Sequence, residues 1–250
     1  MNDRTVVVMP TYNERENLGA MVRRIEASVP RADILVVDDN SPDGTGLLAD
    51  RLAAADPRVH VIHRKVKAGL GAAYVEGFEW AMTQGFGIIV ECDADGSHQP
   101  EELPRLLAAL DDHDMVIGSR WVKGGAVIDW PFLRMMLSRG GSAYARAALS
   151  LRQRDITGGY RAFRSEALRA IDLAQVTSQG YSFQIEMLWR ASRAGLRIAE
   201  VPITFVERQY GVSKMRGTIV LEAMVRVTAW GLGALLDRRR EVDARTLIRS

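Results

Sequence analysis

The sequence is poor in the features that mark secreted and membrane-spanning proteins. Its single cysteine among 250 residues, Cys92, cannot form a disulfide within the chain, and no charged and apolar leader precedes the first strand-like run. The most apolar late segment, Gly217 to Leu236, contains Glu222 and Arg226, so it lacks the roughly 20 uninterrupted apolar residues of a spanning helix. We therefore expect a cytoplasmic protein without a transmembrane segment.

The chain also lacks a large charge excess of either sign. Its formal net charge is +2 at pH 7, whereas a nucleic-acid-binding domain is typically strongly basic, so we expect no nucleic-acid partner. The length suits one sizeable α/β core, and no proline- or serine-rich linker divides it. We therefore expect one domain over residues 1–236, followed by a charged and disordered tail over residues 237–250.

Apolar runs of strand-like composition alternate with stretches of helical periodicity in the first half of the chain. This alternation predicts an α/β domain with a parallel sheet. The predicted strands are Thr5–Met9, Ile34–Val37, Val59–Ile62, Phe86–Cys92 and Met115–Gly118. The predicted helices are Glu14–Ser28, Thr45–Ala55, Leu70–Gln84 and Glu101–Leu110.

The regular alternation stops after Ser119, where glycine-rich pieces such as Thr157-Gly158-Gly159-Tyr160 begin. We expect this half to be α+β in character, with helices at Phe132–Leu149, Phe183–Ala194 and Thr218–Leu236 and a strand at Arg197–Val201. The first of these helices has a polar stripe beside apolar residues. The stripe is Arg134, Ser138, Ser142 and Arg146, and the apolar residues are Leu133, Met136 and Leu137. A helix in a membrane interface and a helix packed on the sheet both show this pattern.

The most informative short stretch is the end of the fourth strand, Asp93-Ala94-Asp95. Period-two alternation points both carboxylates to the same side of the strand end. Ligands of open α/β sheets lie outside the carboxyl ends of strands, and two hard oxygen donors suit Mg²⁺ or Mn²⁺ bound to a diphosphate. A turn in which Asp95-Gly96 merely caps the strand is the alternative.

Two further strand ends carry polar residues that are expected to meet at the same crevice. The second strand ends in Asp38-Asp39, and one of these acids can accept hydrogen bonds from a ribose or a base edge. The first strand runs into Tyr12, Asn13 and Glu14. Helix capping by Asn13, with Glu14 in the positive first turn, explains part of this pattern without a ligand.

Other common site motifs are absent. Gly69-Leu70-Gly71 begins like a dinucleotide fingerprint, but Tyr74 fills the third glycine position, and neither a P-loop nor a serine-hydrolase elbow occurs. The histidines lack metal-ligand spacing, and His98 is predicted to be a solvated loop residue.

Two basic groups lie in the second half of the chain. The segment from Arg120 to Arg161 suits an anionic acceptor, although a solvated face explains most of its charges, and we single out only Arg120 and Arg134. The second group runs from Arg208 to Lys214 in a glycine-containing segment. It fits a loop that folds over a diphosphate and equally an ordinary exposed loop.

Four motifs occur in an order that resembles a known family. They are Pro10-Thr11-Tyr12-Asn13-Glu14, Asp38-Asp39-Asn40-Ser41-Pro42-Asp43-Gly44, Asp93-Ala94-Asp95 and Tyr210-Gly211-Val212-Ser213-Lys214. Together they resemble the polyprenyl (dolichyl) phosphate mannose synthases of glycosyltransferase family two. The resemblance implies a GT-A nucleotide-sugar-binding fold with a central, mostly parallel sheet, a donor-binding half over residues 1–118, an acceptor half over residues 119–236 and a C-terminal helix.

The same resemblance implies a role for individual residues. It assigns donor contacts to Pro10, Tyr12, Glu14, Val37 and Asp39. It assigns the metal and the diphosphate to Asp93, Ala94 and Asp95, with Ser97 as a further metal ligand. The donor phosphates fall to Arg120, Arg208 and Lys214, and the acceptor phosphate to Arg134. Asp95, Arg120 and Arg134 are the implied catalytic residues.

The implied activity is an inverting transfer of mannose from GDP-mannose to a polyprenyl monophosphate, with Mg²⁺ or Mn²⁺ as cofactor. The enzyme would be peripheral at the cytoplasmic face of a membrane, and a separate membrane-anchor protein is a further partner that the resemblance allows. Transfer of glucose from UDP-glucose, transfer of mannose to a soluble glycan and a non-catalytic nucleotide-sugar sensor are the alternatives. The complete set of acidic and basic groups argues against the sensor, because binding alone does not require it.

Overall fold

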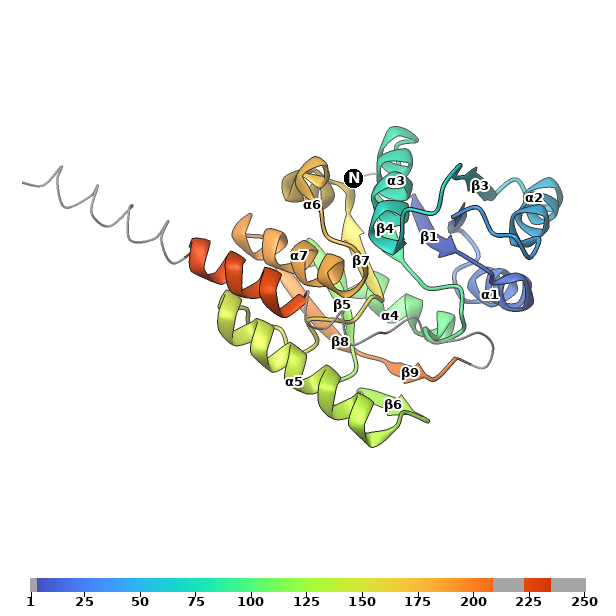
Figure 1. Ribbon diagram of the computed structural model, residues 1–250. Helices are drawn as coiled ribbons and strands as arrows, with labels where there is room; N and C mark the ends of the chain where they lie inside the picture. Colours follow the sequence, from blue (N-terminus) through green and yellow to red (C-terminus); the bar gives the residue numbers. More distant parts are fainter. Residues whose placement is uncertain (1–3, 209–222, 235–250) are drawn as a thin grey trace, which may run out of the picture.

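The computed structural model describes residues 4–208 and 223–234 (Figure 1). Its centre is a seven-stranded sheet in the order β3-β2-β1-β4-β7-β5-β8, and a second, two-stranded sheet pairs β6 with β9. Lys214, the Tyr210–Lys214 motif and the tail over residues 237–250 lie outside the described residues.

The elements follow the predicted alternation in the first half of the chain. The strands are β1 (Thr5–Thr11), β2 (Asp33–Asp38), β3 (Val59–His63), β4 (Ile88–Glu91), β5 (Met115–Ser119), β6 (Ala126–Ile128), β7 (Arg161–Arg164), β8 (Ile198–Pro202) and β9 (Thr204–Val206). The helices are α1 (Arg15–Ser28), α2 (Thr45–Ala55), α3 (Leu70–Thr83), α4 (Leu103–Ala109), α5 (Phe132–Leu149), α6 (Ser165–Ile171) and α7 (Gly180–Arg193), and a further helix spans residues 223–234.

The sheet is parallel except at β7, which runs antiparallel between β4 and β5. The carboxyl ends of β1, β2 and β4 therefore lie at one edge, where Thr11 is in register with Asp38 and Val8 with Glu91. The mostly parallel sheet and the α/β class are confirmed. Strand β7 brings the second half of the chain next to the acidic end of β4.

Helices cover both faces of the sheet, and strand residues alternate between the two cores (Figure 1). Val6 and Val8 pack with α3, α5, α6 and α7, while Val7 and Met9 pack with α1 and α4. This alternation follows from the two-residue period of a strand and explains why the parallel strands are continuously apolar.

Several elements differ from the sequence predictions. The expected helix over Glu101–Leu110 begins as a 3₁₀ turn at Pro100–Glu102 before α4. Strands β6, β7 and β9 were not predicted, because two have only three residues and β7 begins and ends with an arginine. Such strands show too little apolar alternation to be recognised from a local window.

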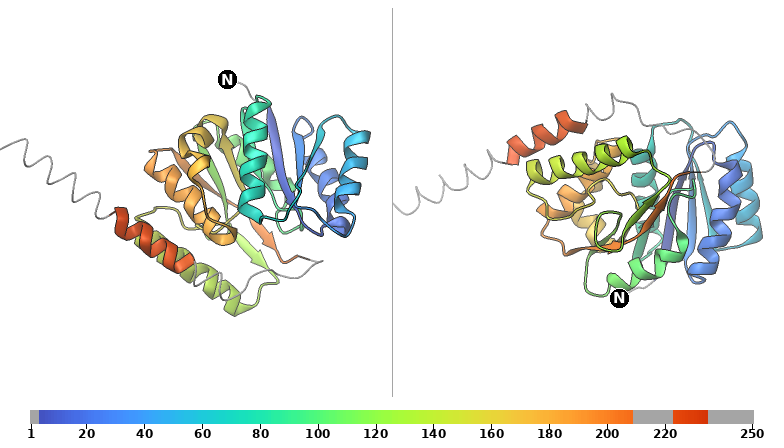
Figure 2. Two further views of the ribbon diagram at one scale, coloured as in Figure 1. Left: turned by 45° about the horizontal axis from the view of Figure 1, so that its top comes forward. Right: turned by 90° about the horizontal axis from the view of Figure 1, so that it is seen from below.

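The first half of helix α5 turns its apolar residues outward, so those residues do not pack on the sheet, whereas Ala145 and Leu149 in its second half belong to the core. Leu133, Met136 and Leu137 are 70%, 51% and 50% exposed, whereas Ser142 from the polar stripe is buried. The helix over residues 223–234 lies beside the second half of α5, where the hydroxyls of Tyr144 and Thr228 are 2.6 Å apart (Figure 2). Among the helices in the described part of the chain, none is long and apolar enough to cross a membrane.

The close contact between α3 and the sheet gives a testable prediction about stability. A Cβ added at Gly77 would lie 2.5 Å from Val8 Cγ1, so we expect Gly77→Ala to lower the free energy of unfolding by about 1–3 kcal/mol through overpacking. Urea unfolding followed by circular dichroism measures this. Gly19→Ala in α1 is the matched control, because its nearest neighbour would lie 3.6 Å away, and equal effects of the two changes would contradict the prediction.

Candidate active site

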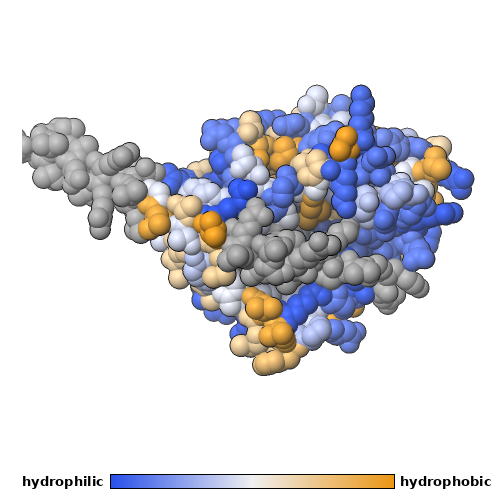
Figure 3. All heavy atoms as spheres, viewed as in Figure 1, coloured by the Kyte–Doolittle hydropathy of each residue, from blue (hydrophilic) through white to orange (hydrophobic). Residues whose placement is uncertain are grey.

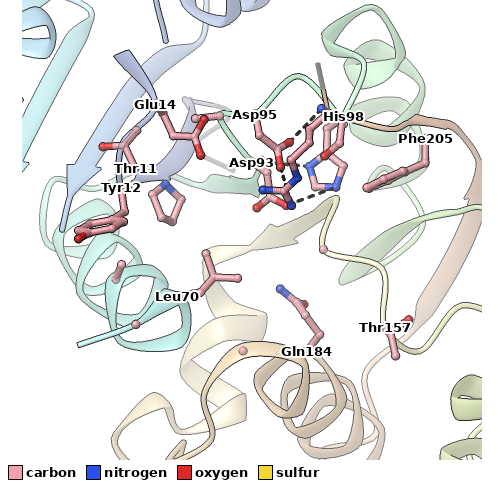
Figure 4. A pocket seen from close by; sticks show the side chains of 18 of the residues that line it. Thr11, Tyr12, Glu14, Leu70, Asp93, Asp95, His98, Thr157, Gln184 and Phe205 are labelled. Atoms are coloured by element: carbon pink, nitrogen blue, oxygen red, sulfur yellow. Dashed lines mark hydrogen bonds and ion pairs between the residues drawn. The ribbon is translucent and has the colours of Figure 1, made fainter. Parts of the chain in front are cut away.

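A pocket of about 350 Å³ lies at the carboxyl ends of β1, β2 and β4 (Figure 4), within the usual size range of small-molecule sites. Both halves of the chain line it. The predicted residues that line it are Pro10, Tyr12, Glu14, Asp39, Asp93, Ala94, Asp95, Ser97, Arg120, Arg134 and Arg208. The structure thus gathers into one cavity residues that are up to about two hundred positions apart in the sequence.

The acidic pair after β4 is held by hydrogen bonds on both sides. The Tyr74 hydroxyl donates to Asp93 Oδ1 at 3.0 Å, and the Ser97 N–H donates to Asp95 Oδ1 at 3.0 Å. Arg208 Nη2 lies 3.1 Å from Asp95 Oδ2. Desolvation raises the pKa of the Asp93 carboxyl, and His98 acts in the opposite direction. The pair is therefore a concentrated acidic site whose charge an arginine partly balances.

His98 is buried, so its prediction as a solvated loop residue is wrong. Its side chain stacks on Tyr160 with ring centroids 4.7 Å apart, and its Nδ1 accepts a hydrogen bond from the Asp93 N–H at 3.0 Å. Burial lowers the pKa of His98, which favours the neutral ring with its proton on Nε2. The imidazole thus orients the backbone at Asp93, a role that only the folded loop reveals.

The residues at the acidic pair fit a divalent cation. Asp93 and Asp95 offer hard carboxylate oxygens, and Ser97 Oγ is buried without a hydrogen-bond partner among the described residues. Within the same residues, no cluster of three or more His, Cys, Asp or Glu side chains forms a complete metal cage. An incomplete set of protein ligands suits Mg²⁺, which usually keeps waters and binds substrate phosphates as well.

Arg120 reaches the pocket as one half of a buried ion pair. Asp155, which is fully buried, accepts hydrogen bonds from Arg120 Nε at 2.7 Å, from Arg120 Nη2 at 2.6 Å and from the Arg120 N–H at 2.8 Å. Trp130 and Phe205 flank the guanidinium at 5.3 and 5.4 Å. Planar bidentate pairing of this kind holds the arginine in one orientation.

The other basic residues of this segment lie in different surroundings. Arg134 lines the pocket, lies over the Trp130 ring at 4.2 Å and pairs with Glu207. A solvated face was expected for most of this basic segment, but Arg161 is fully buried. It donates to three backbone carbonyl oxygens. Buried arginines need such partners, and here they join β7 to α7.

The two acids after β2 have different surroundings. Asp38 binds the hydroxyls of Thr11 and Ser41, whereas Asp39 lines the pocket and accepts a hydrogen bond from the Gly69 N–H at 3.2 Å. Lys67 lies over the Tyr12 ring, with its Nζ 3.4 Å from the ring centroid. This wall therefore combines an aromatic face with charges of both signs.

Val37 does not line the pocket, unlike the other implied donor contacts. Its side chain is fully buried and packs toward Gly77 of α3, where an added Cβ would lie 3.2 Å from Val37 Cγ2. The residue lies on β2 in register with Pro10, but its side chain points into the core and not into the pocket. Val37 and Leu35 share one core cluster, as the two-residue period of the strand requires, whereas Asp39 lies beyond the end of β2 at Asp38 and is free of that alternation.

Several lining residues were missed by the sequence analysis. They are Thr11, Lys67, Gly69, Leu70, Ala73, His98, Trp130, Thr157, Gly159, Gly180, Gln184 and Phe205. Two signals were present: Gly69-Leu70-Gly71 was considered only as a dinucleotide motif, and Thr157-Gly158-Gly159 only as a break in periodicity. Glycines before a helix and in irregular loops permit the close backbone approach that a ligand requires.

The comparisons with known proteins agree with this geometry. A family model described as "Glycosyl transferase family 2" matches residues 6–172, which include β1 to β5 and the acidic pair. The chain belongs to glycosyltransferase family 2. It is therefore a glycosyltransferase, and its mostly parallel sheet with an acidic pair after β4 is the GT-A fold of this family.

This family-2 glycosyltransferase is similar to curated proteins over nearly its whole length. It is 56% identical over 241 residues to the polyprenol monophosphomannose synthase of Mycolicibacterium smegmatis, covering 96% of this chain and 91% of the relative. It is 57% identical over 231 residues to the undecaprenyl-phosphate mannosyltransferase of Micrococcus luteus, covering 92% and 95%. The resemblance to the polyprenyl phosphate mannose synthases, which the four sequence motifs indicated, is thus confirmed.

A solved structure shows the same fold at low sequence identity. It is glucosyl-3-phosphoglycerate synthase from Mycobacterium tuberculosis in complex with Mn²⁺, UDP-glucose and phosphoglyceric acid. The TM-score is 0.69 at 20% identity, and the alignment covers 92% of this chain and 80% of that one. At 20% identity this similarity establishes only that the two proteins share a fold.

The buried pair beside the pocket supplies a second prediction. We expect Asp155→Asn to lower the free energy of unfolding by about 3 kcal/mol, because it leaves the buried Arg120 cation beside a neutral partner. Asp114→Asn, which breaks the more exposed pair with Arg197, should cost less than about 1 kcal/mol. Urea unfolding of both variants distinguishes the two cases, and a loss of similar size would contradict the argument from burial.

Proposed function

We propose that this glycosyltransferase transfers mannose from GDP-mannose to a polyprenyl monophosphate in one inverting step. The observation that carries the proposal is the single cavity in which the acidic pair faces Arg120, Arg134 and Arg208. The names of the two bacterial relatives, which are mannosyl-transferring enzymes of polyprenol chemistry, support the sugar and the acceptor. UDP-glucose as donor remains the alternative to test.

The donor diphosphate would bind at the acidic pair. Asp93, Asp95 and Ser97 would hold Mg²⁺ or Mn²⁺, which supplies positive charge to the diphosphate as it leaves. The Mn²⁺ in the complex of the related fold supports a divalent metal. Arg208, which contacts Asp95 at 3.1 Å, lies within reach of the same group. Tyr12 and Asp39, which line the same pocket, would bind the nucleoside.

The acceptor needs little activation by the protein. A phosphate monoester has its second pKa near about 6, so it is largely a dianion at neutral pH and needs no general base. One of its oxygens would form the bond to the anomeric carbon while the bond from that carbon to the GDP oxygen breaks. Arg134, which lines the pocket, would orient this phosphate and balance its charge, while Arg120 would contact the donor phosphates.

An exposed apolar surface beside the pocket supports a lipid acceptor (Figure 3). It is formed at the start of α5 and in β6 by Ile128, Phe132, Leu133, Met136 and Leu137, which are 44% to 71% exposed. Arg134 and Trp130 of the same segment line the pocket, so this surface adjoins the proposed phosphate site. A large exposed apolar patch marks an interaction site, and here a peripheral position at the cytoplasmic face of a membrane accounts for it. A separate membrane-anchor protein is a further partner to test.

The direct test is transfer by the purified protein. Radiolabelled GDP-mannose, Mg²⁺ or Mn²⁺ and a polyprenyl phosphate in detergent are incubated, and the label in the organic phase is counted. Metal-dependent label supports both the donor and the lipid acceptor. Label transferred only from UDP-glucose would overturn the assignment of mannose as the sugar. No label in the organic phase with either donor would favour a nucleotide-sugar sensor or a missing membrane partner.

The role of the acidic pair gives a prediction for the same assay. We expect Asp95→Ala to lower kcat/KM by at least about 100-fold, because charge on the leaving diphosphate is no longer balanced by a bound cation. Asp50→Ala is the control, since Asp50 forms an exposed pair with His63 away from the pocket. Near wild-type transfer by Asp95→Ala would contradict the proposed role of Asp95 in holding the metal.

Arg208 is expected to act with opposite signs on metal binding and on transfer. In the donor-free protein it pairs with Asp95, so Arg208→Gln should tighten Mn²⁺ binding by about three- to tenfold by removing a competing cation. The same change should slow transfer, because the diphosphate loses a positive partner. Mn²⁺ binding measured by electron paramagnetic resonance without nucleotide checks the first effect, and weaker binding would contradict it.

The apolar surface on α5 is expected to contact the lipid part of the acceptor. A double change of Leu133 and Met136 to asparagine should lower transfer to a long-chain polyprenyl phosphate in vesicles by about tenfold, because buried apolar contact with the lipid is lost. Transfer to a short, water-soluble prenyl phosphate should stay within twofold. An equal loss with both acceptors would point to damage in the pocket and against a lipid contact.

A further inference from the structure

A glutamine on the pocket floor has an unused hydrogen-bond acceptor. Gln184 of α7 lines the pocket and is only 4% exposed, and its Oε1 has no hydrogen-bond partner among the described residues. Figure 4 shows its side chain pointing from α7 toward Asp93 and His98. A buried acceptor without a partner costs about 1–3 kcal/mol, so a ligand hydroxyl that donates to it is favoured.

The orientation of this amide is determined by a second buried residue. Gln184 Nε2 donates to Glu91 Oε2 at 2.9 Å, and Glu91 is fully buried in β4. This contact uses the NH₂ end of the amide, so the carbonyl oxygen is turned away from Glu91. Burial raises the pKa of Glu91 to about 7 against the opposing effect of Arg161, which also donates to the Gln184 backbone oxygen at 2.8 Å. Both the backbone and the side chain of Gln184 are therefore held in place.

Gln184 and the acidic pair line the same pocket. Glu91 is the last residue of β4, and Asp93 follows two residues later in the loop that lines the pocket. A Cβ added at Gly159, another lining residue, would lie 3.4 Å from Gln184 Nε2 and 3.8 Å from His98 Cε1. Gly159 therefore lies close to both the Gln184 amide and His98, whose Nδ1 accepts from the Asp93 N–H, so the amide and the acidic pair line neighbouring parts of one pocket.

From this arrangement we propose that Gln184 is the residue that recognises the transferred sugar, with its Oε1 accepting a hydrogen bond from one sugar hydroxyl. Glu91 is the positioning residue that presents this oxygen. The inference rests on the proposed function, because it places a nucleotide-sugar donor with its diphosphate at Asp93 and Asp95. A site that is built to accept from a hydroxyl discriminates strongly against a sugar that lacks it.

The test combines a protein variant with altered donors. Wild type and Gln184→Met, which keeps the length of the side chain without the acceptor, are assayed at pH 8 with GDP-mannose and with analogues in which one sugar hydroxyl at a time is replaced by hydrogen. GDP affinity is measured by calorimetry for each protein. Gln175→Met, the same change at an exposed glutamine outside the pocket, is the control.

We expect wild type to lose at least about 30-fold in kcat/KM for one analogue and Gln184→Met to lose a similar factor with the parent donor. The variant should then show less than threefold further loss for that analogue, with GDP affinity within twofold of wild type. Glu91→Gln should weaken the discrimination in part, because its amide also donates and lets Gln184 turn over.

Other results would overturn the inference. If Gln184→Met keeps the wild-type response to every deoxygenation, the unused oxygen serves a buried water and not the sugar. A wild-type enzyme that is insensitive to all single deoxygenations would reject the inference without any variant, even if Gln184→Met fails to fold. Absence of transfer from the parent donor by wild type would instead overturn the proposed function.

Discussion

Two carboxylates at the end of the central strand β4 create a concentration of negative charge around which the pocket is organised. Tyr74 and the Ser97 N–H bind the acidic pair of Asp93 and Asp95, His98 accepts from the backbone at Asp93, and Arg208 pairs with Asp95. Strand β4 occupies the middle of the sheet, so both halves of the chain reach its end. A cation and a diphosphate fit there because hard oxygen donors and arginines converge on the same point.

The second half of the chain contributes charges that are buried at some cost in desolvation. Asp155 holds Arg120, and Arg161 donates to three carbonyl oxygens close to Glu91 and Gln184. Replacing buried ion pairs with apolar residues is often neutral or stabilising, so such pairs are weak evidence for stability. Their position around the pocket indicates that they hold polar side chains in fixed directions, as preorganised sites require.

The predictions from sequence were accurate where local pattern and structure coincide. The strands and helices of the first half were found within a few residues, and the acids of three strand ends do meet in one pocket. The sequence analysis erred at His98 and did not foresee the burial of Arg161, because a local window shows the type of a residue and not its burial. Val37 was assigned to the donor by resemblance, yet its side chain packs into the core. Lys214 stays a prediction.

The sequence by itself determined the α/β alternation and the acidic pair at a strand end, because periods of two and 3.6 residues are local properties of the backbone. Only the tertiary structure decided that Arg120, Arg134 and Gln184 line the same cavity as this pair. That arrangement depends on β7 running antiparallel between β4 and β5 and on α7 packing against α3. Such contacts join residues distant in sequence, and no periodicity along the chain encodes them.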